Sequence, residues 1–403
     1  MSKQAYILHG KGELVPELDF SVGQLLLRQL TIHDTRVAQI DAHTGKEQTF
    51  KYILDTSRKL AIYLQKEGLK VNDAVAVCSE NNLEFCIPVC ATFYLGAIVC
   101  PLNPLYSTGE LKHALTITKP KYIFISMIAL NNIISILKEL HWSPRILLLN
   151  DYDNIDKSWM SICEAVSSVS DDNINKFQAV PVDVNNHVTA ILCSSGTTGL
   201  PKGVMWTDKN ITTIIRMYVS NQLVANAKII PLGKFETDET LGPNCEGELC
   251  FKGDLIMKGY YNDKKSTSMT IDKDGWLHTG DVGYYDEEGY FYIVDRVKEL
   301  IKYKGYQVPP AELEAILLTY SGIKDAAVIG IPNEKTGELP IAFVVKQKGF
   351  DIREEDIIQY VNERVSNPKR LRGGIKFVDS IPKTPSGKIL RRVLRDMILK
   401  SKI

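Results

Sequence analysis

The 403-residue sequence has no excess of charge of either sign, because 48 Lys and Arg residues balance 48 Asp and Glu residues. This balance gives no indication that nucleic acid or an anionic membrane surface is the main partner. The eight cysteines are scattered, and no Cys-x-x-Cys pair with a matching partner pair occurs. A zinc site is therefore not expected, and free thiols in a reducing compartment are the simpler interpretation.

Long hydrophobic runs are also scarce. Residues 1–20 contain no long apolar stretch, so a signal peptide is not expected. Residues 85–102 are the most apolar segment and are about as long as a membrane span, but they contain Pro88, Tyr94 and Gly96. A buried helix that turns at Gly96 into a short strand explains this segment better, so no transmembrane segment is expected.

The first half of the chain alternates between helical and strand-like patterns, which predicts a parallel sheet covered on both faces. Apolar β-branched runs predict strands, and apolar residues at helical spacing predict helices. Strands are expected at 71–78, 97–99, 121–126, 145–149 and 188–193, helices at 49–64, 82–94 and 107–118, and a surface loop at 164–187. Ser107 and Glu110 form a capping-box pattern at the start of the third helix.

The second half predicts further strands and then a smaller α/β domain. Strands are expected at 247–259, 276–281, 289–295, 326–331, 341–346 and 375–378, and helices from 310, at 354–365 and from 390. The predicted fold class is α/β, with a large N-terminal domain of parallel-sheet layers at 1–295 and a smaller C-terminal domain at 296–403.

The stretch Ser194–Val204 follows the expected strand 188–193 and is rich in hydroxyls and glycines, with one lysine. Glycines let the backbone approach a ligand closely, and successive backbone N–H groups can form an anion-binding concavity. A polyphosphate is the natural ligand, although the spacing is not that of the P-loop. An ordinary Gly/Ser hairpin between two strands is the alternative. The predicted nucleotide-binding residues here are Ser194, Ser195, Gly196, Thr197, Thr198, Gly199 and Lys202.

This stretch closely resembles the phosphate-binding motif of the adenylate-forming (AMP-binding) superfamily, which includes acyl-CoA synthetases, beetle luciferases and peptide-synthetase adenylation domains. A second segment, Gly275–Asp281, resembles the ribose-binding motif of that family. A carboxylate such as Asp281, at a strand end beside Gly280, can accept hydrogen bonds from both ribose hydroxyls. A capping aspartate in a turn is the alternative, and the resemblance favours ribose binding.

A third segment, residues 292–307, resembles the connection between the two domains of the family. By itself a run of four basic residues within nine indicates a solvent-exposed face. The resemblance implies that Asp295 is the hinge and that Arg296 contacts the ribose. It also implies that Lys298 and Gln307 lie at the adenylate, that Lys302 acts in the second half-reaction, and that Lys304 and Gly305 line the path of coenzyme A.

A fourth segment, Pro382–Lys388, resembles the loop that carries the adenylation lysine of the family. The resemblance implies that Lys388 stabilises the charge between the carboxylate and the α-phosphate, whereas an exposed loop lysine is the alternative. The segment Leu371–Gly374 resembles the corresponding segment of one branch of the family, the 4-coumarate–CoA ligases and beetle luciferases. The implied function is an ATP-dependent acyl-CoA ligase. It uses ATP, Mg²⁺ and coenzyme A to convert a fatty or aromatic carboxylic acid into an acyl-adenylate and then a CoA thioester.

Members of this branch run to roughly 540 residues, so this chain is short by roughly 140. The shortage is expected between Lys202 and Gly247, around residues 205–246, where the family carries a Tyr-Gly-x-Thr-Glu motif and most of its acyl pocket. The alternative function is therefore an impaired or inactive splice or fragment form that acts at most as a nucleotide-binding or regulatory protein. Light emission is not expected, because the luciferin pocket falls in the same missing segment.

The last three residues, Ser401–Ile403, resemble the peroxisomal Ser-Lys-Leu tail. A peroxisomal import receptor is therefore a predicted partner, and the peroxisome is the predicted location, with the cytoplasm as the alternative.

Overall fold

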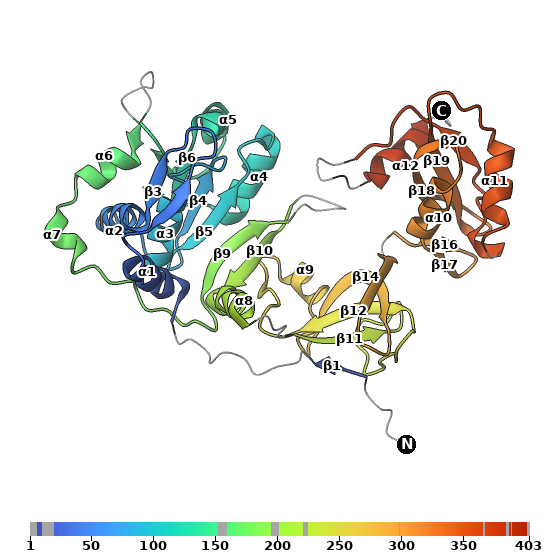
Figure 1. The fold of residues 1–403 in the computed structure, drawn as a ribbon, viewed down its shortest axis with the longest axis horizontal. Coiled ribbons are helices and arrows are strands. Elements are labelled where there is room, and N and C mark those ends of the chain that lie inside the picture. The colour runs from blue at the N-terminus through green and yellow to red at the C-terminus, as the bar shows by residue number, and fades with distance from the viewer. Residues whose placement is uncertain are drawn as a thin grey trace. The chain divides into compact units, whose positions relative to one another are not determined.

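The computed structural model describes the chain except for residues 1–5, 10–19, 152–158, 195–200, 221–224, 298, 366, 384–386, 388 and 401–403. The chain divides into two compact units, and Figure 1 shows their elements. The large-sheet unit comprises residues 9–226 and 252–275, and the C-terminal unit comprises residues 1–8, 227–251 and 276–403. The predicted domain boundary at 295/296 stays a prediction.

The large-sheet unit is built on an eight-stranded sheet with the order β13-β10-β9-β5-β4-β6-β7-β8. The strands are β4 (Ala74–Cys78), β5 (Ile98–Leu102), β6 (Tyr122–Ile125), β7 (Arg145–Leu148), β8 (Met160–Ser161), β9 (Val188–Cys193), β10 (Gly203–Thr207) and β13 (Gly259–Tyr260). The strands from β9 to β8 pair in parallel, whereas β10 and β13 add an antiparallel edge. A separate hairpin joins β2 (Val37–Ile40) and β3 (Glu47–Thr49).

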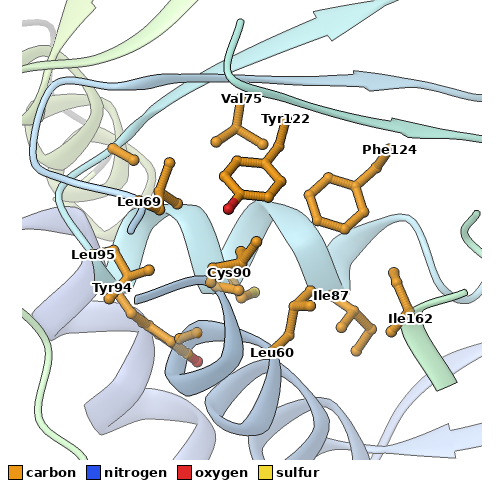
Figure 2. Packing of buried hydrophobic residues seen from close by; sticks show 14 of the residues in the cluster. Leu60, Leu69, Val75, Ile87, Cys90, Tyr94, Leu95, Tyr122, Phe124 and Ile162 are labelled. Atoms are coloured by element: carbon orange, nitrogen blue, oxygen red, sulfur yellow. The ribbon is translucent and has the colours of Figure 1, made fainter. Parts of the chain in front are cut away.

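Helices cover both faces of this sheet. Alternate residues of a strand point to opposite faces, and here the residues on both faces are apolar and need to be buried. On β6, Tyr122 and Phe124 enter one apolar cluster, and Ile123 and Ile125 enter the other. Figure 2 shows the first cluster, in which Phe124 lies near Ile87. The helices of the unit are α1 (Val22–Ile32), α2 (Phe50–Lys66), α3 (Cys86–Tyr94), α4 (Thr108–Thr118), α5 (Met127–Leu137), α6 (Ile162–Ser167), α7 (Asp171–Ile174), α8 (Asp208–Ser220) and α9 (Lys264–Ser268).

Two predictions for this unit are confirmed, those for the segment 85–102 and for the cap of α4. The apolar segment 85–102 forms the buried helix α3, turns at Gly96 with a φ of 62°, and continues as β5. Ser107 caps α4, because its side chain accepts a hydrogen bond from the Glu110 backbone N–H. The Glu110 carboxylate accepts one from the Ser107 backbone N–H, which completes the capping box. None of the helices that the structure describes is long and apolar enough to cross a membrane. In the two units together, none of the eight cysteines forms a disulfide bond, and the structure describes all eight.

Other predictions for the chain's secondary structure are wrong in detail. The predicted surface loop 164–187 contains the end of α6 and the short helix α7, because Ile162, Ala165 and Ile174 bury apolar side chains. The predicted helix 82–94 begins only at Cys86. The predicted strand 247–259 is split, since β12 ends at Lys252 and β13 begins at Gly259, in the other unit's sheet.

The C-terminal unit contains two five-stranded sheets. The first is antiparallel where its pairing is recorded, has the order β1-β11-β12-β14-β15, and is called the site sheet here. Its strands are β1 (Leu8–His9), β11 (Asn226–Ile230), β12 (Gly247–Lys252), β14 (Leu277–Tyr285) and β15 (Phe291–Arg296). Ile229, Leu249 and Tyr285 form one small buried cluster, and Ile230, Cys250 and Trp276 form another.

The second sheet has the order β17-β16-β19-β18, with β20 paired to β19. Its strands are β16 (Ile301–Tyr303), β17 (Tyr306–Val308), β18 (Ile323–Asn333), β19 (Gly337–Lys346) and β20 (Ile375–Phe377), and the helical segments are α10 (Pro310–Leu318), α11 (Glu354–Asn362), η1 (Asn367–Lys369) and α12 (Arg391–Lys400). Val328 on β18 packs in the cluster with α10 and α11, whereas its neighbour Ile329 packs with Leu394 of α12. This arrangement matches the predicted smaller α/β part of the chain.

Candidate functional site

The hydroxyl-rich stretch connects two antiparallel strands. Cys193 at the end of β9 pairs with Gly203 at the start of β10. The backbone N–H of Ser194 donates to the Lys202 carbonyl over 2.8 Å, and the Lys202 N–H donates to the Ser194 hydroxyl over 3.0 Å. Ser194 and Lys202 therefore lie together at the base of the loop. The predicted residues Ser195, Gly196, Thr197, Thr198 and Gly199 lie outside the described residues, so phosphate binding by this loop stays a prediction.

Lys202 itself is held on the large-sheet unit. Its ammonium group donates to the Ser266 hydroxyl over 2.6 Å and lies 4.9 Å from the centre of the Tyr260 ring. The carbonyl of the preceding residue, Pro201, accepts a hydrogen bond from His113 Nε2 over 2.8 Å. Sequence reasoning missed both His113 and Ser266, because they lie 88 and 64 residues from their partners and belong to no motif.

In the C-terminal unit, Asp281 and Arg296 are opposite each other on β14 and β15. Arg296 Nε donates to Asp281 Oδ1 over 2.7 Å, and the Asp281 side chain is 25% exposed, so its carboxylate is accessible at the surface. Thr279 Oγ accepts from the Asp281 N–H over 3.0 Å and donates to the Leu249 carbonyl over 2.9 Å. The predicted ribose-binding residues are therefore side by side and held by neighbouring strands.

Glu248 supports the same segment from β12, and sequence reasoning missed it. One carboxylate oxygen of Glu248 accepts from the Gly280 N–H over 3.1 Å, and the other lies 3.3 Å from His278 Nδ1. Gly280 has a φ of 71°, a conformation that glycine adopts without strain. Phe235 stacks on the His278 ring with 4.0 Å between centroids. The part of β14 that presents Asp281 is thus fixed by hydrogen bonds and by aromatic packing. Asp281 lies in the middle of this strand, which continues to Tyr285, so the predicted strand end at residue 281 is wrong.

Asp295, the predicted hinge, is the penultimate residue of β15. Its carboxylate accepts from the N–H of Arg296 over 2.6 Å and from the N–H of Ala311 over 3.1 Å. Burial raises the pKa of Asp295 above the usual range of a carboxyl group, although those two hydrogen bonds and the nearby Arg391 oppose the shift. The Asp295 side chain therefore links β15 to the N-terminus of α10. Its role as a hinge stays a prediction.

The remaining predicted residues of this region lie on the hairpin β16–β17. Lys302 and Gln307 are opposite each other and exposed, and Lys304 and Gly305 form its two-residue turn with φ angles of 47° and 81°. Two positive φ angles are typical of the tight turn that connects paired strands. Lys298 and Lys388 lie outside the described residues, as does the tail 401–403, so the predictions made for them stay predictions.

Arg391 joins the elements around the predicted hinge and was also missed by sequence reasoning. Its guanidinium donates to Glu299 over 2.7 Å, to Glu314 and to the Val328 carbonyl. Burial alone lowers the pKa of Arg391, but the carboxylates of Glu314 and Glu299 outweigh this effect, so the pKa is raised and this partly buried side chain stays charged. The sequence shows Arg391 only as one of several basic residues at the start of a helix.

The described site residues thus form three groups, one of which is the β16–β17 hairpin with Lys302, Lys304, Gly305 and Gln307. Ser194 and Lys202 lie together in the large-sheet unit, whereas Asp281, Arg296 and Asp295 lie together in the C-terminal unit. That these groups converge on one nucleotide stays a prediction. In the described part of the chain, no three His, Cys, Asp or Glu side chains are grouped as metal ligands.

The chain matches two family profiles. The profile described as "AMP-binding enzyme" matches residues 26–230, and the one described as "AMP-binding enzyme C-terminal domain" matches residues 312–388. The chain is 32% identical to a luciferin 4-monooxygenase of Photuris pensylvanica, over 98% of both chains. It is 30% identical to the 4-coumarate–CoA ligase CCL1 of Humulus lupulus, over 89% of this chain and 90% of the relative.

Solved structures agree. A natural red-emitting luciferase from Phrixothrix hirtus is 29% identical and has a TM-score of 0.67, over 98% of this chain and 100% of that chain. ATP-bound MatB from Rhodopseudomonas palustris is 20% identical and has a TM-score of 0.77, over 93% and 98% of the two chains, which shows likeness of fold.

The alignments also show how much of the relatives this chain lacks. The 538 positions aligned with the Photuris protein contain 98% of the 403 residues, about 395, so about 143 positions have no residue of this chain opposite them. This number agrees with the predicted size of the shortage, whereas its predicted place around residues 205–246 stays a prediction. With two matching profiles, full-length relatives at 32% identity and the same α/β fold, the chain belongs to the family of AMP-binding, adenylate-forming enzymes.

Proposed function

We propose that the protein binds ATP and joins a carboxylic acid to coenzyme A by way of an acyl-adenylate. Membership of the adenylate-forming family and the likeness to 4-coumarate–CoA ligases support this proposal. The acyl substrate that we propose is a fatty or aromatic acid. Because luciferin 4-monooxygenases are among the relatives, the thioester product is the part of the proposal that most needs a direct assay.

The pairing of Asp281 with Arg296 is the observation that carries the proposal. A carboxylate that is 25% exposed can accept hydrogen bonds from two ribose hydroxyls, and the Arg296 guanidinium that contacts it holds it in position. Glu248 and Thr279 hold the segment in place before any ligand arrives. A preorganised site of this kind loses less entropy when it binds its ligand.

The proposed reaction has two displacements. In the first, an oxygen of the substrate carboxylate attacks the α-phosphorus of ATP, and the bond to the pyrophosphate breaks. In the second, the thiolate of coenzyme A attacks the acyl carbon, and AMP leaves. Lys388 is proposed to stabilise the charge in the first step and Lys302 to act in the second, with a domain rotation about Asp295 between them.

The described residues fit coenzyme A at the proposed position, because Lys302 and Lys304 are exposed cations on one hairpin and the thiol carrier is polyanionic. For Mg²⁺ the described residues supply no cluster of ligands. We therefore propose that the ion is held mainly by the phosphates of ATP and by water, which is a common mode for Mg²⁺. It would neutralise the charge on the pyrophosphate.

A pyrophosphate-release assay over a panel of fatty and aromatic acids tests the proposal, with the thioester measured in the same samples. We expect release that depends on both the acid and ATP, and thioester only when coenzyme A is added. Lys388→Ala should abolish release, whereas Lys348→Ala, at an exposed turn, should leave it unchanged. Thioester formation at the wild-type rate in Lys388→Ala would contradict the proposed role of that lysine.

A second candidate function is nucleotide binding without turnover. The specific observation in its favour is the absence of about 143 aligned positions, because an acyl pocket needs concave apolar walls. Under this candidate the protein binds ATP but releases no pyrophosphate with any acid in the panel. Calorimetric titration with ATP, run beside the release assay, separates the two candidates.

A further inference from the structure

Two side chains from outside the β9–β10 hairpin hold the carboxyl end of the hydroxyl-rich stretch. His113 on α4 contacts the carbonyl of Pro201, and Ser266 on α9 contacts the ammonium group of Lys202. Both side chains are partly buried, and both belong to the large-sheet unit. Consecutive residues are therefore anchored by two independent elements.

The contact to Pro201 defines the chemistry of His113. A carbonyl oxygen can only accept, so His113 Nε2 carries the proton in this hydrogen bond. His113 lies on α4 between Ala114, which is buried, and Lys112, whose ammonium group pairs with Glu139. The imidazole thus sits on an ordered helix, where a donor can be aimed at one point of the loop.

The two partners of Lys202, Ser266 and Tyr260, are themselves held in place by neighbouring elements. The Ser266 N–H donates to Asp263 Oδ1 over 2.9 Å, which caps α9 and fixes the serine. The preceding strand β13 pairs with β10, where Val204 is opposite Tyr260. The same Tyr260 presents its ring to the Lys202 ammonium group. A flexible four-carbon side chain is therefore ordered by one hydroxyl and one aromatic ring.

We propose that His113 and Ser266 are positioning residues that fix Pro201 and Lys202 for binding the polyphosphate of a nucleoside triphosphate. The inference rests on the proposed function, since it takes ATP as the ligand of this loop. An ammonium group has three donors, so one bond to Ser266 leaves it able to donate to a phosphate oxygen. Fixing the lysine in advance removes part of the rotamer entropy that binding would otherwise cost.

The test uses the full-length chain and two matched pairs of variants. His113→Ala and Ser266→Ala remove the donor and the acceptor, whereas His113→Gln keeps an N–H donor and Ser266→Thr keeps the hydroxyl. We expect each alanine variant to raise the Kd for ATP, measured by calorimetry, about three- to tenfold, which is the range for loss of one hydrogen bond. The Gln and Thr variants should stay within about twofold of the wild type, since they retain the contact.

Stability and exchange measurements separate positioning from general damage. The urea midpoint of all four variants should match the wild type, and hydrogen–deuterium exchange of the backbone amides of residues 202–206 should be faster in the alanine variants alone. An unchanged Kd in both alanine variants, or an equal rise in His113→Gln, would overturn the proposal. A lower Kd in Ser266→Ala would also overturn it, because the serine would then withhold the lysine from the ligand.

The same measurements also distinguish failure of the ligase proposal from failure of the positioning role of His113 and Ser266. If the wild type binds ATP but forms no thioester, the ligase proposal fails. The Kd values of the four variants for ATP then still decide whether His113 and Ser266 are positioning residues. If the wild type binds no ATP, both the ligase proposal and the positioning role are overturned. In that case, faster exchange in the alanine variants would identify the two contacts as structural.

Discussion

The eight-stranded sheet and the site sheet solve the problem of burial in different ways. The eight-stranded sheet has helices on both faces, so successive residues such as Ile123 and Phe124 are both fully buried. The site sheet has two buried clusters of three residues, while Tyr292 and Ile293 on its strand β15 are 44% and 59% exposed and the adjacent Tyr290 is 64% exposed. Order in the site sheet therefore depends more on polar contacts, such as those of Glu248, and these contacts also present the predicted ribose-binding pair.

We expect the largest loss of stability, and the largest difference between the two sheets, when a large side chain is truncated to alanine. Phe124→Ala removes a fully buried ring from the eight-stranded sheet and should cost about 3–5 kcal/mol of unfolding free energy, because the cavity cannot collapse fully. Tyr292→Ala on the site sheet should cost less than about 1 kcal/mol, since its ring is exposed and mainly stacks on Tyr284. Urea denaturation followed by circular dichroism gives both values. Equal losses in the two variants would remove the distinction between the sheets.

Glycine substitutions should give opposite signs in the two units. At Gly247 on the site sheet, an added Cβ would meet the carbonyl oxygen of Ile230 and lie 2.7 Å from the Ile229 side chain. Gly247→Ala should therefore cost about 1–3 kcal/mol. At Gly109, on the first turn of α4, an added Cβ meets nothing within 4 Å, so Gly109→Ala should stabilise the chain by up to about 1 kcal/mol. Thermal unfolding of the two variants checks the signs, and a stabilising Gly247→Ala would contradict the packing described here.

The large-sheet unit should also lose stability as the pH rises above neutrality. Burial alone would lower the pKa of His187, but its hydrogen bonds to the Asp208 carboxylate over 2.5 Å and to the Gly96 carbonyl over 2.8 Å outweigh this, so the pKa is raised. A raised pKa means that the folded protein holds this proton more tightly than the unfolded chain. The contribution is therefore complete below about pH 6.5 and is lost as the pH rises through the folded-state pKa.

His187→Gln is the matched variant for this pH dependence. It should be less stable than the wild type at pH 6, by less than Phe124→Ala, and its stability should vary less between pH 6 and pH 9. Urea midpoints at several pH values measure both. A difference between the two proteins that grows with pH would show that the pair contributes in the opposite sense.

The smallest effect on stability is expected at the pair of Asp281 and Arg296. Both side chains are partly exposed, so Asp281→Asn should change the unfolding free energy by less than about 1 kcal/mol. The same variant should bind ATP at least tenfold more weakly, because a neutral amide neither retains the charge that pairs with Arg296 nor accepts two hydroxyls equally well. A large loss of stability would show that the pair holds the site sheet together rather than presenting a ligand-binding carboxylate.

The two sheets also differ in how far the sequence predicts them. Strands such as Tyr122–Ile125 are uniformly apolar and follow helices with clear periodicity, so local pattern was enough to predict the parallel sheet and its two covered faces. The segment 252–275 was not predicted to leave the site sheet and pair with β10, because that pairing depends on residues more than 50 positions away.

The candidate site shows the same division. Asp281 and Arg296 were predicted from motifs, and the structure places them opposite each other. The supporting residues carry no sequence signal of their own, since they act through contacts with residues far away in the sequence; they are His113, Glu248, Ser266 and Arg391. Motifs report the groups that meet a ligand, whereas the residues that position those groups emerge only when the chain is folded.

Calorimetric titration of the full-length protein with ATP and Mg²⁺ is the decisive experiment for the proposed nucleotide site. We expect saturable binding of one nucleotide per chain, with the affinity reduced at least tenfold in Asp281→Asn and unchanged in Asp286→Asn, whose carboxylate caps a turn at the far end of β14. No binding to the wild type, or equal binding to wild type and Asp281→Asn, would contradict it.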